Sequence, residues 1–472
     1  MSSTPPPVAR PRAAIPLLAS GAAFLAMLDA TVTNLAIPDL HEDFPSASVQ
    51  HLTWIITLYA VLFAALLAPA GRLADVVGRR TLFRVGVGLF TAMSLLCALA
   101  PNLPVLLAAR GLQGAGAAAM IPASLAILLH DTPADRRARA IGLWSAAGAL
   151  AAAVGPSVGG VLVDSLHWRS LFYINVPIGL ALVYFARVVP GSGSVGGRLP
   201  DLFGTALLGG GIGALTLGVT QGQTWQWGDI RTVSALAGGA VAVGLALWRS
   251  TRHPTPAVET SLWRNRTFAV ANVASLMFGA ALLPTLLIGV LFLTKAWHYS
   301  ELQAGLAMTP GALTAAVAAV AVSRLTPRYG PRPAVVGGSV IMTAATVWTL
   351  LVLSEEPSFL TFWLPAGALL GLGIGALSTG TASAAALSVA PQRFAGATGL
   401  NTTARQLGGA LGVATLAAIL PTRTPATIDD FVHVYVFSAV VVLLAGIAGL
   451  WLTLRPQVAP APSDSPKETV AA

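Results

Sequence analysis

Two segments far apart in the chain, GRLADVVGRR at residues 71–80 and SRLTPRYGPR at residues 323–332, each follow a long apolar run. Set 252 residues apart, they share four residue types: Arg72 and Arg324, Leu73 and Leu325, Gly78 and Gly330, and Arg80 and Arg332. A second pairing sets Gly114 and Gly116 against Gly373 and Gly375, 259 residues apart. These matches predict a duplicated structural unit, with chance similarity in a low-complexity chain as the alternative.

The composition places this chain in a membrane. Of its 472 residues 55% are hydrophobic and only 10% are charged, and the mean hydropathy is +0.75. A soluble chain carries about 25% charged residues, so this one has too few charges to cover a surface in water. The single cysteine, Cys97, lies in an apolar run, which excludes a disulfide framework and a cysteine-based metal site. We therefore predict an all-α polytopic membrane protein.

Apolar runs long enough to cross a bilayer core, roughly 20 residues each, recur fourteen times along the chain. Their predicted bounds are 13–38, 52–70, 81–100, 104–129, 139–163, 170–188, 201–220, 232–249, 267–294, 303–323, 334–353, 361–388, 396–420 and 431–454. Combined with the repeat, they predict two six-helix bundles with two inserted helices. The predicted parts are an N-terminal tail at 1–12, a first bundle at 13–190, a linker with two helices at 191–260, a second bundle at 261–454 and a disordered tail at 455–472.

The positive charge follows the predicted topology. The net charge is +9 and the isoelectric point is near 10.5. Of the 27 Lys and Arg residues, 21 lie in segments on the same side as the termini and four in the opposite loops. This asymmetry predicts cytoplasmic N- and C-termini in a multi-pass cell-membrane protein. It also explains the basic balance without a nucleic-acid partner, which would need basic residues gathered on one face of a soluble domain.

Six motifs lie in order on the predicted spans. They are LDATVTNLAIP at 28–38, GRLADVVGRR at 71–80, LLAARGLQGAGAA at 106–118, GPSVGG at 155–160 after Gly142, WRSLFYINVPIG at 168–179 and RQLGGALG at 405–412. Through these motifs, residues 13–454 resemble the major facilitator superfamily, specifically its fourteen-spanning drug:proton antiporter branch. The chain departs from the family pattern at Ala151, where a glycine is usual.

The resemblance implies the major facilitator fold and export of an amphipathic small molecule by proton exchange and alternating access. The energy source would be the proton gradient, without a cofactor or metal, and we expect a monomer. Proton-driven uptake of a metabolite is the alternative within transport, and the GPSVGG motif argues against it. An enzyme would need converging nucleophile, base or metal ligands, which the sequence does not offer. No phosphate-binding Gly-Lys-Ser/Thr loop is present in the sequence, which excludes ATP-driven pumping by this chain.

Apart from Asp201, the first residue of its span, Asp29 is the only acidic residue inside a predicted span. Helical rise places it roughly 13 Å from the outer boundary, and places Arg110 roughly 9 Å from that boundary. An ionised carboxylate at such a depth is costly and is by default a functional candidate. We predict that Asp29 and Arg110 form the proton-coupling centre, with Asp29 carrying the proton. The alternative is an ion pair that only ties two helices together.

Arg405 is the second arginine inside a span and lies near the midplane, with Asn401 one turn earlier on the same face. The candidates for lining a substrate cavity are Asn34, Gln113, Asn401, Arg405 and Gln406. With two arginines and one carboxylate inside, we expect neutral or weakly anionic amphipathic substrates. A purely structural hydrogen-bond hub is the alternative for Arg405.

Two segments are predicted to control the change of conformation. In the fifth span, small residues permit close helix approach and Pro156 removes a backbone hydrogen bond, which suits a pivot. In the loop after the second span, Asp75 among arginines can pair with a neighbouring helix end and lock one bundle arrangement. The gating candidates are Gly71, Asp75, Gly78, Arg79, Arg80, Gly155, Pro156, Gly159 and Gly160. Ordinary helix packing and charge that only sets topology are the respective alternatives.

Overall fold

The computed structural model of this chain describes residues 14–45, 47–189, 200–354, 356–419 and 428–452. Within these residues all regular secondary structure is helical. The first half contains α1 (Ala14–Val32), η1 (Thr33–Ala36), α2 (Ile37–Asp43), α3 (Val49–Val77), α4 (Arg79–Ala98), α5 (Leu103–Asp131), η2 (Ala134–Arg136), α6 (Arg137–Ser165), α7 (Ser170–Tyr173), α8 (Asn175–Phe185) and η3 (Ala186–Val188). The inserted pair is α9 (Leu202–Trp225) and α10 (Ile230–Ser250). The second half contains η4 (Thr260–Arg264), α11 (Arg266–Lys295), α12 (Glu301–Tyr329), α13 (Arg332–Val352), η5 (Phe359–Trp363), α14 (Leu364–Leu387), η6 (Pro391–Arg393), α15 (Phe394–Ile419) and α16 (Ile428–Gly449).

Helices occupy all fourteen predicted spans. Twelve of the described helical segments are long and apolar enough to cross a membrane. The segment Ser170–Phe185 is shorter and is divided into α7 and α8. The other segment outside the twelve, α15, is long enough but carries Asn401, Arg405 and Gln406 in its middle. The chain is therefore a multi-pass membrane protein with the predicted all-α fold.

The end of the first span differs from the prediction. The apolar run continues to Pro38, but α1 ends at Val32, where the chain tightens into η1 before the separate helix α2. Beyond it, Asp43 accepts hydrogen bonds from Trp168 Nε1 at 2.9 Å and from Arg169 at 2.6 Å, which fasten α2 to the start of α7. Burial acts to raise the pKa of Asp43, but these hydrogen bonds and the nearby positive charges outweigh it and hold the pKa below its ordinary value.

The two loops that share a sequence also share a backbone turn. Gly78 between α3 and α4 has a φ of 111°, and Gly330 between α12 and α13 has a φ of 74°. Side chains other than glycine rarely adopt this region, so both turns depend on glycine. The duplication is therefore visible in the backbone as well as in the sequence.

Helix packing confirms the repeat and corrects its register. Three close contacts recur in the second half: Gly114 on Tyr59 and Gly371 on Gly311, Gly116 on Phe90 and Gly373 on Met342, and Gly86 on Met120 and Gly338 on Leu377. The shift is 252 residues for the second and third helices of each half and 257 for the fourth. Gly114 thus corresponds to Gly371, and the predicted shift of 259 residues is wrong. Small residues at every second position fit both alignments, and only their packing partners distinguish them.

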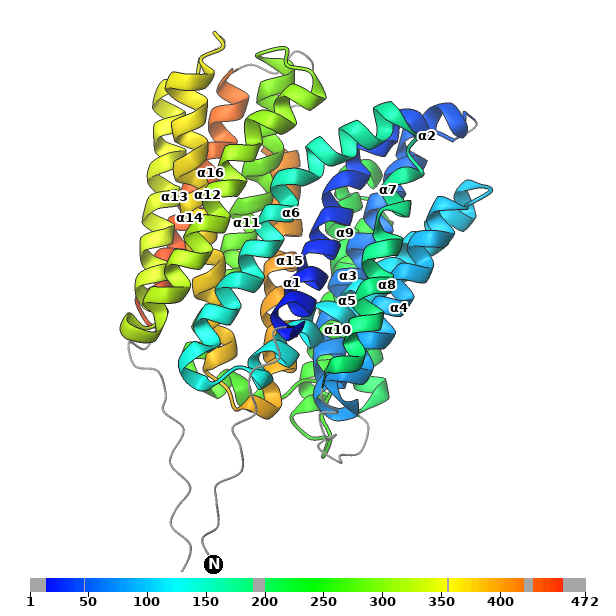
Figure 1. Ribbon diagram of the computed structural model, residues 1–472, viewed down its shortest axis with the longest axis vertical. Coiled ribbons are helices and arrows are strands. Elements are labelled where there is room, and N and C mark those ends of the chain that lie inside the picture. The colour runs from blue at the N-terminus through cyan, green and yellow to red at the C-terminus, as the bar shows by residue number, and fades with distance from the viewer. Residues whose placement is uncertain (1–13, 46, 190–199, 355, 420–427, 453–472) are drawn as a thin grey trace, which may run out of the picture.

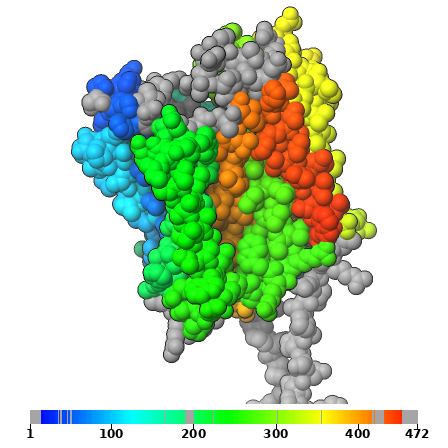
Figure 2. Space-filling view, turned by 180° about the vertical axis from the view of Figure 1, so that it is seen from behind, coloured from blue at the N-terminus to red at the C-terminus, as the bar shows by residue number. Residues whose placement is uncertain are grey.

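The two halves stand side by side (Figure 1), and the beginning of α1 and the end of α16 lie at the same lower end of the view. Between the halves, α6 packs along α12, and α15 packs on α3 and α5. The inserted helix α9 contacts α10, α3 and α15, so it touches both halves. Figure 2 shows this pair, in green, beside the seam between the blue first half and the orange and red second half.

Candidate proton site, substrate cavity and gate

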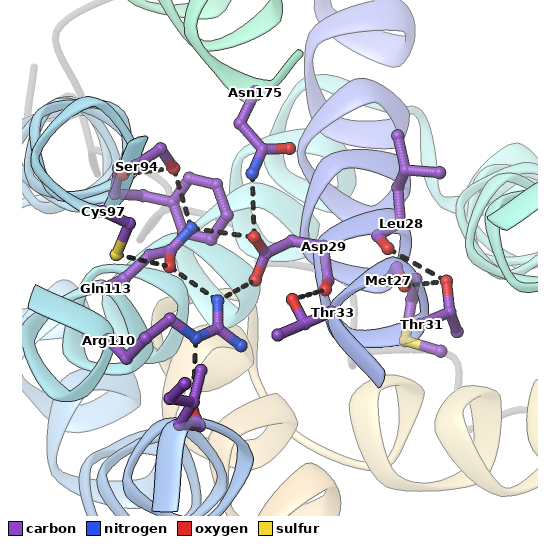
Figure 3. A network of polar contacts seen from close by, with 12 residues as sticks. Met27, Leu28, Asp29, Thr31, Thr33, Ser94, Cys97, Arg110, Gln113 and Asn175 are labelled. Atoms are coloured by element: carbon purple, nitrogen blue, oxygen red, sulfur yellow. Dashed lines mark hydrogen bonds and ion pairs between the residues drawn. The ribbon is translucent and has the colours of Figure 1, made fainter. Parts of the chain in front are cut away.

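The carboxylate of Asp29 lies inside the first half with none of its surface exposed. Its Oδ2 accepts a hydrogen bond from Arg110 at 2.8 Å. Its Oδ1 accepts one from Gln113 Nε2 at 2.9 Å and one from Asn175 Nδ2 at 2.8 Å. Figure 3 shows these donors converging from α5 and α8 on α1. The structure therefore brings together the predicted pair and surrounds the carboxylate with donors.

Arg110 has partners besides Asp29. It donates to Gln113 Oε1 at 2.6 Å and, through Nε, to the carbonyl of Ile55 at 3.3 Å. Its guanidinium also lies 4.4 Å from the ring centre of Tyr59 and 5.5 Å from that of Phe172. Cation–π contacts of this kind stabilise a desolvated charge. Arg110 would thus keep favourable contacts if Asp29 took up a proton.

All the side-chain partners of Asp29 offer N–H donors, an arrangement that fits the ionised carboxylate. A protonated carboxyl would need an acceptor for its O–H. Gln113 Oε1 already receives Arg110, and Asn175 Oδ1, which has no partner, would serve only if the amide of Asn175 turned. Protonation therefore requires the donors to rearrange. The protonation of Asp29 on α1 is thereby linked to the positions of α5 and α8. Such a link is the physical requirement for coupling a proton to a movement.

The sequence prediction missed part of this network. Asn175 lies in the WRSLFYINVPIG motif, but nothing in the sequence showed that its amide meets Asp29 across 146 residues. Ser94 accepts from Gln113 at 2.7 Å and orients it. A signal existed for Asn175: a strongly polar residue in an apolar run is costly in a membrane unless it has a partner.

The five cavity candidates lie in three places. Gln113 lies in the carboxylate network. Asn401 and Arg405 line a small cavity between the halves, together with Leu125, Trp144, Ala382, Thr398 and Thr402. Gln406 is adjacent in α15 and is not among the lining residues. Asn34 lies in η1, and its side chain falls outside the described part of the structure.

The predicted loop motif joins the two halves at one end of the bundle. Asp75 accepts hydrogen bonds from the backbone N–H of Gly396 at 2.7 Å and of Ala395 at 3.3 Å, at the beginning of α15. Negative charge is favourable at a helix N-terminus. Arg79 pairs with Asp75 at 3.3 Å and also donates to the carbonyl of Pro391. These contacts hold α3 of one half against α15 of the other.

The remaining loop residues have separate roles. A Cβ at Gly71 would lie 2.5 Å from the carbonyl oxygen of Ala395, so the close approach of α3 and α15 requires glycine there. Arg80 donates to the carbonyl of Arg187 at 3.0 Å and thus stays within its own half. Gly78 provides the left-handed turn described above.

Glu259, from the linker after α10, is a further contact between the halves that the sequence prediction did not include. Its carboxylate pairs with Arg72 of the first half at 2.6 Å and with Arg393 of the second at 2.8 Å. We call Glu259 with these two arginines the linker clasp. No spacing rule connects Arg72 to a residue 187 positions away, so only the fold reveals it.

Helix α6 lies between α1 and α12. A Cβ at Gly155 would lie 2.1 Å from Thr31 Oγ1, while Pro156 packs against Gly305 of α12. Gly160 faces Leu302, and Gly159 is buried. The small residues therefore press α6 against both halves at once, although α6 itself runs unbroken through Pro156.

Comparison with known proteins places this geometry in a family. The sequence profile of the Major Facilitator Superfamily matches residues 19–291 and 268–471. The chain belongs to the major facilitator superfamily. It is 33% identical to the multidrug resistance protein Stp of Mycobacterium tuberculosis over 88% of this chain and 77% of that protein. It is 35% identical to the puromycin resistance protein pur8 of Streptomyces alboniger over 92% of this chain and 89% of that protein.

The superfamily fold is also found among solved structures. The crystal structure of the human organic anion transporter MFSD10 (TETRAN) matches with a TM-score of 0.65 at 15% identity, over 94% of this chain and 100% of that one. At this identity the match speaks for the fold alone.

Proposed function

We propose that this superfamily member is a proton-coupled antiporter that exports a drug, an antibiotic or another amphipathic small molecule across the cell membrane. Support comes from its similarity to multidrug and puromycin resistance proteins over most of the chain. The observation that carries the coupling step is the buried carboxylate of Asp29, held by Arg110 and two amides. Both termini are proposed to be cytoplasmic, because the basic residues concentrate on their side of the membrane.

The proposed cycle uses the arrangement of the halves. Contacts of Asp75, Arg79 and Glu259 close the cytoplasmic end in this conformation. A proton reaching Asp29 from outside would weaken its pairing with Arg110 and let the N–H donors from α5 and α8 move. The halves would then rock about α6 and α12, and cargo would enter the cavity beside Arg405 from the cytoplasm. Release of the proton to the cytoplasm would return Asp29 to its ionised form.

The proton gradient is proposed as the sole energy source, with a monomer as the working unit and no chemical reaction on the substrate. The test is resistance to a panel of toxic amphipathic compounds in cells that express the chain, before and after an uncoupler collapses the gradient. We expect lower intracellular accumulation of the exported compounds, lost on uncoupling. Gradient-dependent accumulation of a compound inside the cells would instead indicate uptake by symport.

A further inference from the structure

The cavity between the halves combines one cation with one aromatic wall. Arg405 and Thr398 line it from α15, and Trp144 lines it from α6 of the other half. The indole N–H of Trp144 donates to Ser124 at 3.1 Å, so the polar edge of the ring is already satisfied. What Trp144 adds to the cavity is therefore apolar ring surface, suited to stacking against an aromatic molecule.

The charge of Arg405 is not neutralised by the protein. Its hydrogen-bond partner among the described residues is Ser378 Oγ at 3.4 Å, a neutral group at a long distance. No carboxylate of the described chain forms an ion pair with it, whereas Arg110, the other arginine within a span, pairs with Asp29 at 2.8 Å. A guanidinium stays protonated in proteins, and a charge deep in a membrane protein is costly without a counter-charge. The guanidinium of Arg405 therefore has no anionic partner within the described structure and could bind an anionic group of a ligand.

A second group beside Arg405 also lacks a partner. The hydroxyl of Thr398, a residue only 5% exposed, lines the same cavity and makes no hydrogen bond within the described structure. By contrast, the amide of Asn401 already donates to Ser275 at 2.8 Å. One free hydroxyl and one free guanidinium on the same helix, seven residues apart, offer donors to a single acidic group.

Resting on the proposed export function, we infer that Arg405 and Thr398 form an anion-binding subsite for aromatic acids. The cargo class is a ring system that stacks on Trp144 and carries a carboxylate or another acidic group that pairs with Arg405. A guanidinium binds a carboxylate through two parallel hydrogen bonds, which gives orientation as well as affinity. The subsite lies in the second half, apart from the Asp29 network of the first, so cargo charge and proton charge are held by different residues.

The test measures binding directly, with two dyes that share a xanthene ring but differ in charge. Purified protein in detergent is titrated with anionic fluorescein and with cationic rhodamine 6G, and fluorescence anisotropy is corrected with protein-free micelles. Loss of a charge-assisted hydrogen bond corresponds to about tenfold in affinity or more. We expect Arg405→Gln to weaken fluorescein binding about tenfold and to change rhodamine 6G binding less than about twofold.

Two further variants separate charge from folding. Arg405→Lys keeps a cation without the planar guanidinium and should fall between the wild type and Arg405→Gln for fluorescein. Arg139→Gln removes an exposed arginine at the beginning of α6 and should leave both affinities unchanged. Equal weakening of both dyes by Arg405→Gln would show a structural role and overturn the inference. So would fluorescein binding that is absent from the wild type or indifferent to Arg405.

Transport by the same variants distinguishes this inference from the proposed function. Proton-driven export of rhodamine 6G, combined with fluorescein binding that does not depend on Arg405, would leave the exporter standing and remove the anion subsite. Arg405-dependent fluorescein binding, without gradient-driven transport of either dye, would leave the subsite standing and remove the exporter.

Discussion

At the residue scale, the chemistry of the proposed site depends on how few groups surround Asp29. Three N–H donors, from Arg110, Gln113 and Asn175, hold a carboxylate with no exposed surface. Every hydrogen bond to the ionised form favours that form over the protonated one. The three donors therefore stabilise the ionised carboxylate.

Asn175 offers the cleanest change to this balance, because it donates to Asp29 at 2.8 Å and makes no other hydrogen bond in the described structure. Asn175→Leu removes one donor from the ionised carboxylate and keeps a side chain that branches at the same atom. A hydrogen bond to a charged group contributes roughly 1.5 kcal/mol or more. Its loss should favour uptake of a proton, so we expect the midpoint of the pH dependence of transport to move to higher pH.

The matched control for Asn175 is Ser94→Ala, which removes a contact to Gln113 and not to Asp29. The pH midpoint of transport by Ser94→Ala should move less than that of Asn175→Leu. The midpoints are read from the initial rates at which everted vesicles take up a compound exported in the resistance test, at a series of external pH values. A midpoint that stays in place in Asn175→Leu would mean that the ionisation of Asp29 does not limit transport.

At the element scale, the distance at which two helices can pack depends on single side-chain atoms. The Cβ that Gly155→Ala would add lies 2.1 Å from Thr31 Oγ1, so α1 and α6 must separate or Thr31 must change rotamer. Overpacking of this kind costs about 1–3 kcal/mol. We expect a lower melting temperature and slower transport from Gly155→Ala, both measured on purified protein.

A second substitution, at Thr31, tests whether this contact causes the lower melting temperature of Gly155→Ala. Thr31→Ala removes the clashing oxygen, so the double variant Gly155→Ala with Thr31→Ala should recover most of the melting temperature. Gly148→Ala on the same helix is the control, since a Cβ there would meet Met27 at 3.5 Å, an ordinary contact. If the double variant melts no higher than Gly155→Ala alone, the contact between α1 and α6 is not the reason.

The linker clasp is the second prediction at this scale. Glu259→Gln keeps the shape but removes the charge that joins Arg72 to Arg393. Since this pairing spans the two halves, its loss should open the adjacent end more often. In a Cys97→Ser background, a thiol at Ala395, a residue with no exposed surface, should react with a maleimide severalfold faster when Glu259→Gln is also present.

Two controls accompany the thiol measurement. A thiol placed at Ser234, an exposed residue of α10, should react at the same rate with and without Glu259→Gln. Glu356→Gln, an exposed acid at the other end of the second half, should leave the reactivity at 395 unchanged. Unaltered protection of the thiol at 395 in Glu259→Gln would show that the clasp does not hold this end closed.

The same elements mark what the sequence could and could not predict. Run length predicted helices at all fourteen spans, because each crossing needs about 20 apolar residues whatever its neighbours. It did not place the end of α1 at Val32, since η1 and α2 continue the apolar run. The pairing of Asp29 with Arg110 followed from depth and charge, while Asn175 and Glu259 depend on contacts between distant segments that no local pattern encodes.

At the scale of the whole molecule, two related bundles meet along α6 and α12 and along α3 and α15. The fifth helix of each half packs on the second helix of the other: Gly142 lies against Ala319, and Gly399 lies against Leu67. The positions of the acidic residues do not follow this symmetry. The first half holds the buried carboxylate of Asp29 and also Asp75 at the contact with α15, whereas Phe278 and Pro327 lie near the corresponding places in the second. Proton handling is therefore proposed for one half and cargo binding for the cavity between both.

The most direct measurement is transport by purified protein in liposomes, comparing the wild type with Asp29→Asn under an imposed pH gradient and without one. The account predicts that the wild type accumulates a compound exported in the resistance test against its concentration gradient when protons flow the other way. Asp29→Asn, folded and still able to exchange that compound across the membrane without a gradient, should accumulate none. Gradient-driven accumulation by Asp29→Asn at the wild-type level would contradict the account, because the proton would then be carried elsewhere.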